Sequence, residues 1–195
     1  SWNANGRDER EFAIAWATRE GLPDPSAIGT WAALLGDVEF DVFDSDFPMC
    51  YSWGHAAQLV EQNSPPRLGE GMFRHFAVVE DFADKLETCQ RALRAIEPLD
   101  VPTLTLATHV TSSYIELHRT IWDVSHRYAH ADLSLPETQQ LLLTDLLRLD
   151  AAGTANTNAI KAWRTSLEPE PWHHRVHDAI SATQETVHRL DTHIR

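Results

Sequence analysis

Cysteines, cationic side chains and long apolar runs are all scarce in this sequence. Cys50 and Cys89 are the only cysteines among 195 residues, which excludes a framework of several disulfides, leaves room for one bridge and favours a reducing compartment. The 29 acidic residues outnumber the 16 basic ones and give a formal net charge of −13. That balance leaves no surplus of cations to neutralise phosphates or an anionic membrane surface. We therefore predict no nucleic-acid partner and no membrane partner.

No segment of the chain has the length and apolar character of a membrane span or a secretion signal. A membrane-spanning helix needs about 18 or more consecutive apolar residues, and the segment 1–20 lacks the apolar core of a signal peptide. Hydrophobic residues make up 43% and charged residues 23% of the chain, which is ordinary for globular proteins. These features predict a soluble, cytoplasmic protein that folds as a single domain over 1–195.

Sequence motifs that identify a reaction are also missing. The chain contains no Gly-x-Ser-x-Gly elbow, no phosphate-binding Walker loop and no dinucleotide-binding fingerprint. The sequence therefore leaves open whether the protein is an enzyme, and it points to no particular cofactor.

Helical periodicity dominates what is present. In the last two thirds of the chain, apolar residues recur every three or four positions between segments that contain proline. Helices of this length with short connections pack antiparallel to their neighbours. We predict an all-α protein built on an antiparallel four-helix bundle over 72–195. Its helices are predicted at about 72–97, 103–131, 136–167 and 172–194.

The N-terminal third differs because it holds nine of the 17 aromatic residues. Residues 1–63 are predicted to form short helices at about 7–20, 26–35 and 48–62, which pack on the bundle as a flank or lid. Asp37 to Asp46 contains five acids and no base, and we expect a charged loop there. Within it, the alternation of Val38, Phe40 and Val42 with acids predicts one short strand.

Small and polar residues gather at one predicted level of the bundle. Residues at equal height on antiparallel neighbours have numbers with a constant sum, and this register places polar groups from all four helices together. One interpretation is a ligand cavity between the helices. The other is a satisfied polar layer that sets helix register, with the Tyr114 ring filling the space beside Gly153. The predicted ligand-binding residues are Gln90, Thr111, Tyr114, Asn156 and Thr183.

The 11 histidines suggest metal binding by their number, but their spacing opposes it. His126 and His130 form one pair a helical turn apart, and His173 and His177 form another. The two pairs fall at opposite ends of the predicted bundle, so they cannot share one ion, and we predict no metal site. His118 flanks the apolar seam near the polar layer. It is the best single candidate for a general base or an axial ligand.

Three functions are consistent with these patterns. The leading one is binding of a small organic molecule in the polar layer of the bundle, with or without chemistry on that molecule. An alternative is an acidic interaction module that presents the 37–46 loop and nearby aromatic residues to a basic protein partner. A further alternative is a metal-dependent or haem-dependent enzyme that uses His118.

Overall fold

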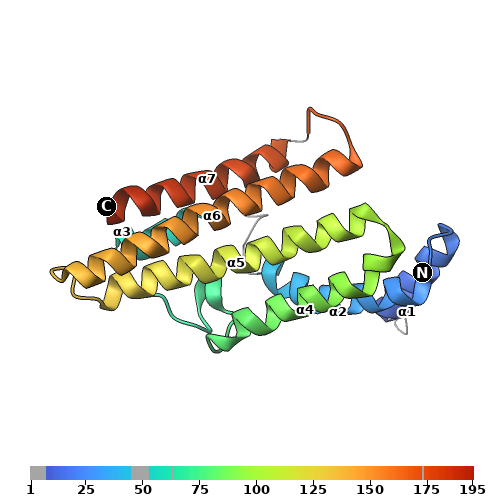
Figure 1. Cartoon of the computed structure of the whole chain (residues 1–195), viewed down its shortest axis with the longest axis horizontal. Coiled ribbons are helices and arrows are strands. Elements are labelled where there is room, and N and C mark those ends of the chain that lie inside the picture. The colour runs from blue at the N-terminus through green and yellow to red at the C-terminus, as the bar shows by residue number, and fades with distance from the viewer. Residues whose placement is uncertain (1–7, 45–52, 63, 173) are drawn as a thin grey trace.

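The computed structural model describes residues 8–44, 53–62, 64–172 and 174–195, and these form helices with no strand among them (Figure 1). The all-α class predicted from the sequence is confirmed. The α-helices are α1 (Glu9–Arg19), α2 (Pro25–Asp44), α3 (Trp53–Glu61), α4 (Glu80–Ile96), α5 (Pro102–His130), α6 (Pro136–Leu167) and α7 (His174–Ile194); Gly71–Phe73 and Glu97–Leu99 are short 3-10 turns.

Prolines and apolar spacing define the two longest helices. Pro102 and Pro136 lie at the start of α5 and α6, where the missing N–H costs nothing because first-turn N–H groups have no helical acceptor. Along α5 the buried side chains recur every three or four residues, which places them on one face. This buried stripe contains Val110, Tyr114, Leu117, Ile121 and Val124.

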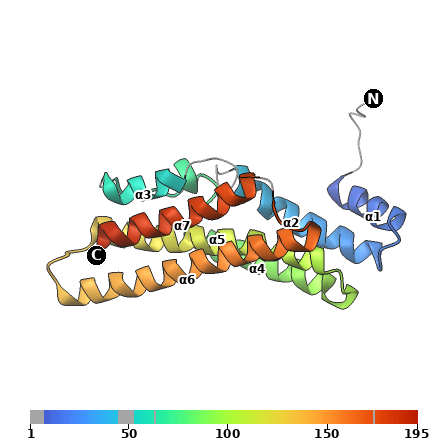
Figure 2. The ribbon, with the colours of Figure 1, turned by 90° about the horizontal axis from the view of Figure 1, so that it is seen from above.

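α5 is the central helix of the molecule (Figures 1 and 2). It forms an antiparallel hairpin with α6, and α7 then returns along α6. On the other side of α5 lies α4, which also packs against α2, while α3 packs against α7. Because α5 has neighbours on several sides, it also buries Ile115, His118 and Trp122 outside its main stripe.

The predicted four-helix bundle is not confirmed as a closed arrangement. In such a bundle the first and last helices, α4 and α7, would be neighbours. Instead α4 packs mainly against α2 and α5, whereas α7 packs against α6 and α3. The N-terminal helices take these positions because they have apolar faces to bury: Leu35 and Val38 of α2, and Ala56 and Val60 of α3, belong to the main core.

The strand and the acidic loop predicted near residue 40 are both corrected by α2. This helix continues through Gly36 to Asp44, so residues 37–44 are helical, and residues 45 and 46 lie outside the described part of the chain. The helix continues because Leu35 and Val38, one turn apart, are both buried, and that spacing favours a helix over a strand. Gly36 lies beside the carboxylate of Glu9 of α1.

The N-terminal helices are attached to the rest of the fold by specific contacts. A Cβ on Gly29 of α2 would lie 2.5 Å from Ile14 of α1, so glycine allows these two helices to approach closely. Trp31 of α2 donates a hydrogen bond of 2.8 Å from Nε1 to Thr108 Oγ1 of α5. These contacts connect the aromatic-rich segment to the central helix.

α4 begins eight residues later than the sequence predicts. Gly71 has a φ of +54°, a left-handed conformation that glycine adopts easily and that interrupts a helix. Asp81 then accepts hydrogen bonds from the backbone N–H groups of Ala77 (2.5 Å) and Val78 (3.0 Å). These bonds satisfy donors ahead of the first turn, and α4 starts at Glu80.

None of the helices in the described ranges is both long and apolar enough to cross a membrane.

Candidate functional site

Asn156 connects three helices in the interior of the protein. Its side chain is fully buried on α6. Its Nδ2 donates to Ser113 Oγ on α5 at 3.1 Å, and its Oδ1 accepts from Thr183 Oγ1 on α7 at 3.0 Å. Ser113 in turn donates to the backbone oxygen of Val110 at 2.7 Å. The amide therefore has partners on both sides, as a buried polar group requires.

Tyr114 and Thr111 lie beside this amide on α5. Both side chains are buried. Burial raises the pKa of the Tyr114 hydroxyl well above its usual value, and a hydrogen bond with the Asn156 side chain offsets part of that rise. Thr111 donates to the carbonyl of Ala107 in its own helix at 3.4 Å. Four of the five predicted ligand-binding residues, Thr111, Tyr114, Asn156 and Thr183, are thus buried near one another.

Gln90 does not join this polar layer. It is exposed on α4, whereas the preceding residue, Cys89, is buried. The reason is the position of α4: because its neighbours are α2 and α5, its buried stripe carries Phe82, Cys89 and Ala92. Gln90 lies about 100° away on the helix and faces solvent. Its predicted inward position is wrong.

The space beside Gly153 is filled by α7, not by the Tyr114 ring as expected. A Cβ on Gly153 would lie 2.7 Å from Val187 Cγ2 and 3.8 Å from Thr183 Cγ2. Glycine therefore brings α6 and α7 close together at the level of Asn156. The hydrogen bonds and this close approach are those expected of a layer that sets helix register, which is the second interpretation of the sequence pattern.

His118 is packed inside the core of the fold. Its side chain is fully buried, and its ring lies 6.1 Å from the Phe73 ring and 5.4 Å from the Phe76 ring, between centroids. Burial lowers the pKa of His118 well below its usual value, against hydrogen bonds with the backbone of Tyr114 and of Met72 that raise it. This is the environment of a neutral core histidine.

His126 and His130 stack on each other and on an aromatic ring. The rings of His126 and His130 are stacked at 4.4 Å, and His126 also stacks on Trp122 at 5.2 Å. His173 lies outside the described residues, so the second predicted pair has no structural account. Among the residues that the structure describes, no group of three or more histidine, cysteine or acidic side chains could hold a metal ion.

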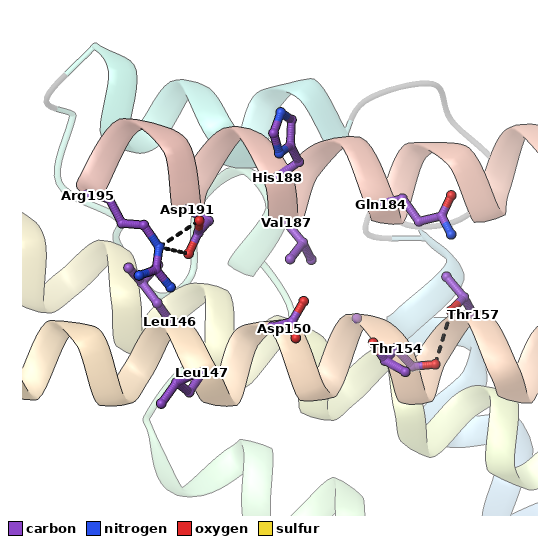
Figure 3. Close-up of a pocket in the computed structure, with 11 residues that line it drawn as sticks. Leu146, Leu147, Asp150, Thr154, Thr157, Gln184, Val187, His188, Asp191 and Arg195 are labelled. Carbon is purple, nitrogen blue, oxygen red and sulfur yellow. Dashed lines mark hydrogen bonds and ion pairs between the residues drawn. The ribbon is translucent and has the colours of Figure 1, made fainter.

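A groove of about 500 Å³ runs along the outer side of the α6–α7 contact (Figure 3). Its α6 wall follows residues spaced three or four apart, and its α7 wall does the same, because one face of each helix borders it. Gly153 is shared with the close contact described above, so the groove lies next to the polar layer. It is lined by Leu146, Leu147, Asp150, Gly153, Thr154, Thr157, Gln184, Val187, His188, Asp191 and Arg195.

Charged, apolar and hydrogen-bonding groups are distributed along this groove. Asp191 and Arg195 lie at one end, where Arg195 Nε contacts both carboxylate oxygens of Asp191 at 2.7 and 2.8 Å. Asp150 and Val187 lie in the middle, and Thr157 is among the polar residues at the other end (Figure 3). The Thr157 hydroxyl donates to the backbone oxygen of Thr154 at 3.0 Å, which leaves its lone pairs available as acceptors.

Sequence reasoning missed this groove. On α7 the groove residues form a polar stripe at helical spacing, namely Gln184, His188, Asp191 and Arg195. In a sequence such a stripe is typical of any solvent-exposed helix face. The one available signal was Gly153, because a small residue within a helix allows close approach of a neighbour. Comparison of the chain with protein-family profiles, with curated proteins and with solved structures gave no match.

Proposed function

We propose that the protein binds a small amphiphilic organic molecule in the groove between α6 and α7. One observation carries this proposal: the groove has an apolar part, formed by Leu146, Leu147 and Val187, in line with polar groups from both helices. Its volume of about 500 Å³ falls within the range typical of small-molecule sites. The proposal keeps the predicted class of function. It moves the site from the interior of the bundle to the outer side of the contact between α6 and α7.

The exposure of Leu147 supports an occupant for this groove. Leu147 is 66% exposed although it lies well inside α6. Burying a leucine side chain is favourable by roughly 2 kcal/mol relative to leaving it in water. An apolar ligand segment that covers Leu147 would recover part of that free energy.

A groove-blocking variant tests this proposal directly. The neutral fluorophore N-phenyl-1-naphthylamine is the probe, because its emission rises in apolar surroundings. Thr154 is exposed on the groove wall, so Thr154→Trp should fill the groove and abolish the fluorescence increase. Ala155 is exposed on the same turn but does not line the groove, so Ala155→Trp should retain it. Equal binding by both variants would contradict the proposed site.

A second candidate function is association of the chain with another copy through the tip of the α5–α6 hairpin. Leu133, Leu135, Leu141 and Leu143 are between 39% and 51% exposed there. In residues 133–143 the only charged side chain is Glu137, so this segment adds little repulsion between two acidic chains. This candidate is again an interaction module, but its contact surface is the tip of the α5–α6 hairpin and not the predicted 37–46 loop.

Oligomeric state tests the second candidate. Light scattering after size-exclusion chromatography should show a dimer that Leu143→Glu converts to a monomer. Leu167, 51% exposed at the opposite end of α6, gives the matched control Leu167→Glu, which should remain dimeric. A wild-type protein that is monomeric at all concentrations would rule this candidate out.

A further inference from the structure

We infer that the ligand of the α6–α7 groove is an organic cation with an apolar tail, and that Asp150 is its counter-ion. This inference rests on the proposed function and specifies its ligand class.

Asp150 is the uncompensated charge of the groove. Among the residues that the structure describes, it makes no hydrogen bond or ion pair. The basic residue nearest to it in the sequence is Arg148, two positions away, and Arg148 pairs with Asp123 at 3.2 Å and with Asp145 at 3.6 Å. A carboxylate without a partner in a groove attracts a positively charged group.

The guanidinium of Arg195, which belongs to the groove lining, is already paired with a carboxylate. Arg195 contacts both oxygens of Asp191 through Nε, so these two charges balance each other. An anion would have to compete with the carboxylate of Asp191 for Arg195 and would also be repelled by Asp150. Because Arg195 and Asp191 balance each other, Asp150 gives the groove lining a negative charge, in the same direction as the net charge of −13 of the chain.

Apolar side chains flank Asp150 and define the second half of the ligand. Leu146 and Leu147 precede it on α6 and Val187 faces it from α7 (Figure 3). Leu146 belongs to the core, whereas Leu147 is 66% exposed. An ammonium group that pairs with Asp150 therefore lets an attached alkyl or aryl group extend toward Leu147 or Val187. The geometry fits a primary amine with an apolar tail better than a fatty acid or a phosphorylated molecule.

Three probes that share one tail separate the head-group chemistry. Octylammonium, octanol and octanoate are compared by their ability to displace N-phenyl-1-naphthylamine at low ionic strength. Because an exposed ion pair contributes little, we expect octylammonium to bind about threefold to fivefold more tightly than octanol, and octanoate to bind most weakly. Added salt should reduce the difference, since it screens exposed charges.

A pair of charge-matched variants shows whether Asp150 is responsible. Asp150→Asn and Asp178→Asn remove the same charge from exposed positions, but Asp178 of α7 does not line the groove. The preference for octylammonium should disappear in Asp150→Asn and persist in Asp178→Asn. Both positions are exposed, so circular dichroism should show unchanged folding in both variants.

Different outcomes of these experiments overturn the cation assignment and the groove as a binding site. If all three probes displace the fluorophore equally, or if both variants lose the preference equally, the cation assignment is overturned while the groove remains a binding site. If Thr154→Trp leaves fluorophore binding intact, the groove is not the site, and both the proposed function and the cation assignment are overturned.

Discussion

Val187 of α7 occupies the space that a side chain at position 153 of α6 would need. The distance from an added Cβ on Gly153 to Val187 Cγ2 is 2.7 Å, well inside van der Waals contact. Valine is branched at Cβ and has few alternative rotamers, so it cannot move aside easily. The contact holds α6 and α7 together at the level of the Asn156 hydrogen bonds and beside the groove.

Gly153→Ala should destabilise the protein, although alanine is the better helix former. Alanine within a helix is worth about 1 kcal/mol over glycine, while forcing a methyl group into a packed contact costs about 1–3 kcal/mol. We expect a net loss of about 1 kcal/mol in urea unfolding. In a Val187→Ala background the clash is absent, so the same substitution should become stabilising. A destabilisation that persists in that background would show that Val187 is not the cause.

Thr183→Val should destabilise the protein, because it removes one hydrogen bond of the buried polar layer. The substitution keeps the shape of the side chain but removes the donor to Asn156 Oδ1, and an unsatisfied buried acceptor costs about 1–3 kcal/mol. The control is Thr144→Val, because Thr144 is exposed and its hydroxyl bonds only to the carbonyl of Gln140 in its own helix. Guanidinium unfolding should show a larger loss of unfolding free energy for Thr183→Val than for Thr144→Val. Equal losses would contradict a stabilising role of the Thr183–Asn156 hydrogen bond.

His118 should make folding sensitive to mild acid. The buried ring has a lowered pKa, whereas in the unfolded chain it binds a proton near about pH 6.5. The contribution of His118 to the free energy of unfolding is therefore fully present above that pH. It is lost as the pH falls below it, by up to about 1.4 kcal/mol per pH unit for one proton. His75, whose charge lowers the pKa further, acts in the same direction.

The pH dependence of unfolding in two glutamine variants isolates this effect. His118→Gln removes the titrating group and should flatten the fall in stability between about pH 7 and about pH 5. His109 is exposed on α5, and His109→Gln should leave the wild-type slope unchanged. A wild-type slope in His118→Gln would assign the acid sensitivity to other groups.

The ion pair between Arg127 and Asp145 should respond asymmetrically to mutation. Arg127 Nε lies 2.5 Å from Asp145 Oδ2, and the side chain of Asp145 is 6% exposed while that of Arg127 is 37% exposed. Arg127→Met leaves a buried carboxylate with a weaker partner and should cost about 3–5 kcal/mol. Asp145→Asn leaves an arginine that still reaches water and should cost less. Thermal unfolding of the two variants gives the comparison.

An exposed pair provides the control for that prediction. Arg119 NH1 lies 3.9 Å from Glu116 on the same helix, and both side chains are about 40% exposed. Arg119→Met should therefore change stability by less than about 1 kcal/mol. If Arg127→Met proves no more harmful than Arg119→Met, the buried carboxylate is not held in place by Arg127.

Local sequence patterns predicted α6 within its observed limits and α5 and α7 to within two residues. Apolar spacing and proline act within a single helix, so they can be read without knowing its neighbours. The same patterns failed for α2, where the predicted helix ended at residue 35 and alternating residues suggested a strand after it. Packing of α2 against α1 and α4 outweighed both local signals, because burial of Leu35 and Val38 requires a continuous helix.

The candidate site was predictable only in part. Antiparallel register brought Asn156 and Thr183 together correctly, since a short loop between α6 and α7 leaves little freedom in their alignment. Gln90 was misplaced because its burial depends on which helices flank α4. The groove could not be predicted, because an exposed stripe on α7 becomes a groove wall only when α6 lies at a suitable distance.

The sequence by itself determined an acidic, all-helical chain with long helices, because composition and periodicity are local properties of the residues. Only the tertiary structure decided that α4 packs against α2 and α5 while α7 packs against α6 and α3, and that the polar layer is hydrogen-bonded across three helices. It also decided that Asp150 lies in a groove without a partner among the residues that the structure describes. These features depend on distances between segments far apart in the chain. Burial and charge pairing set those distances, and neither can be read from one helix alone.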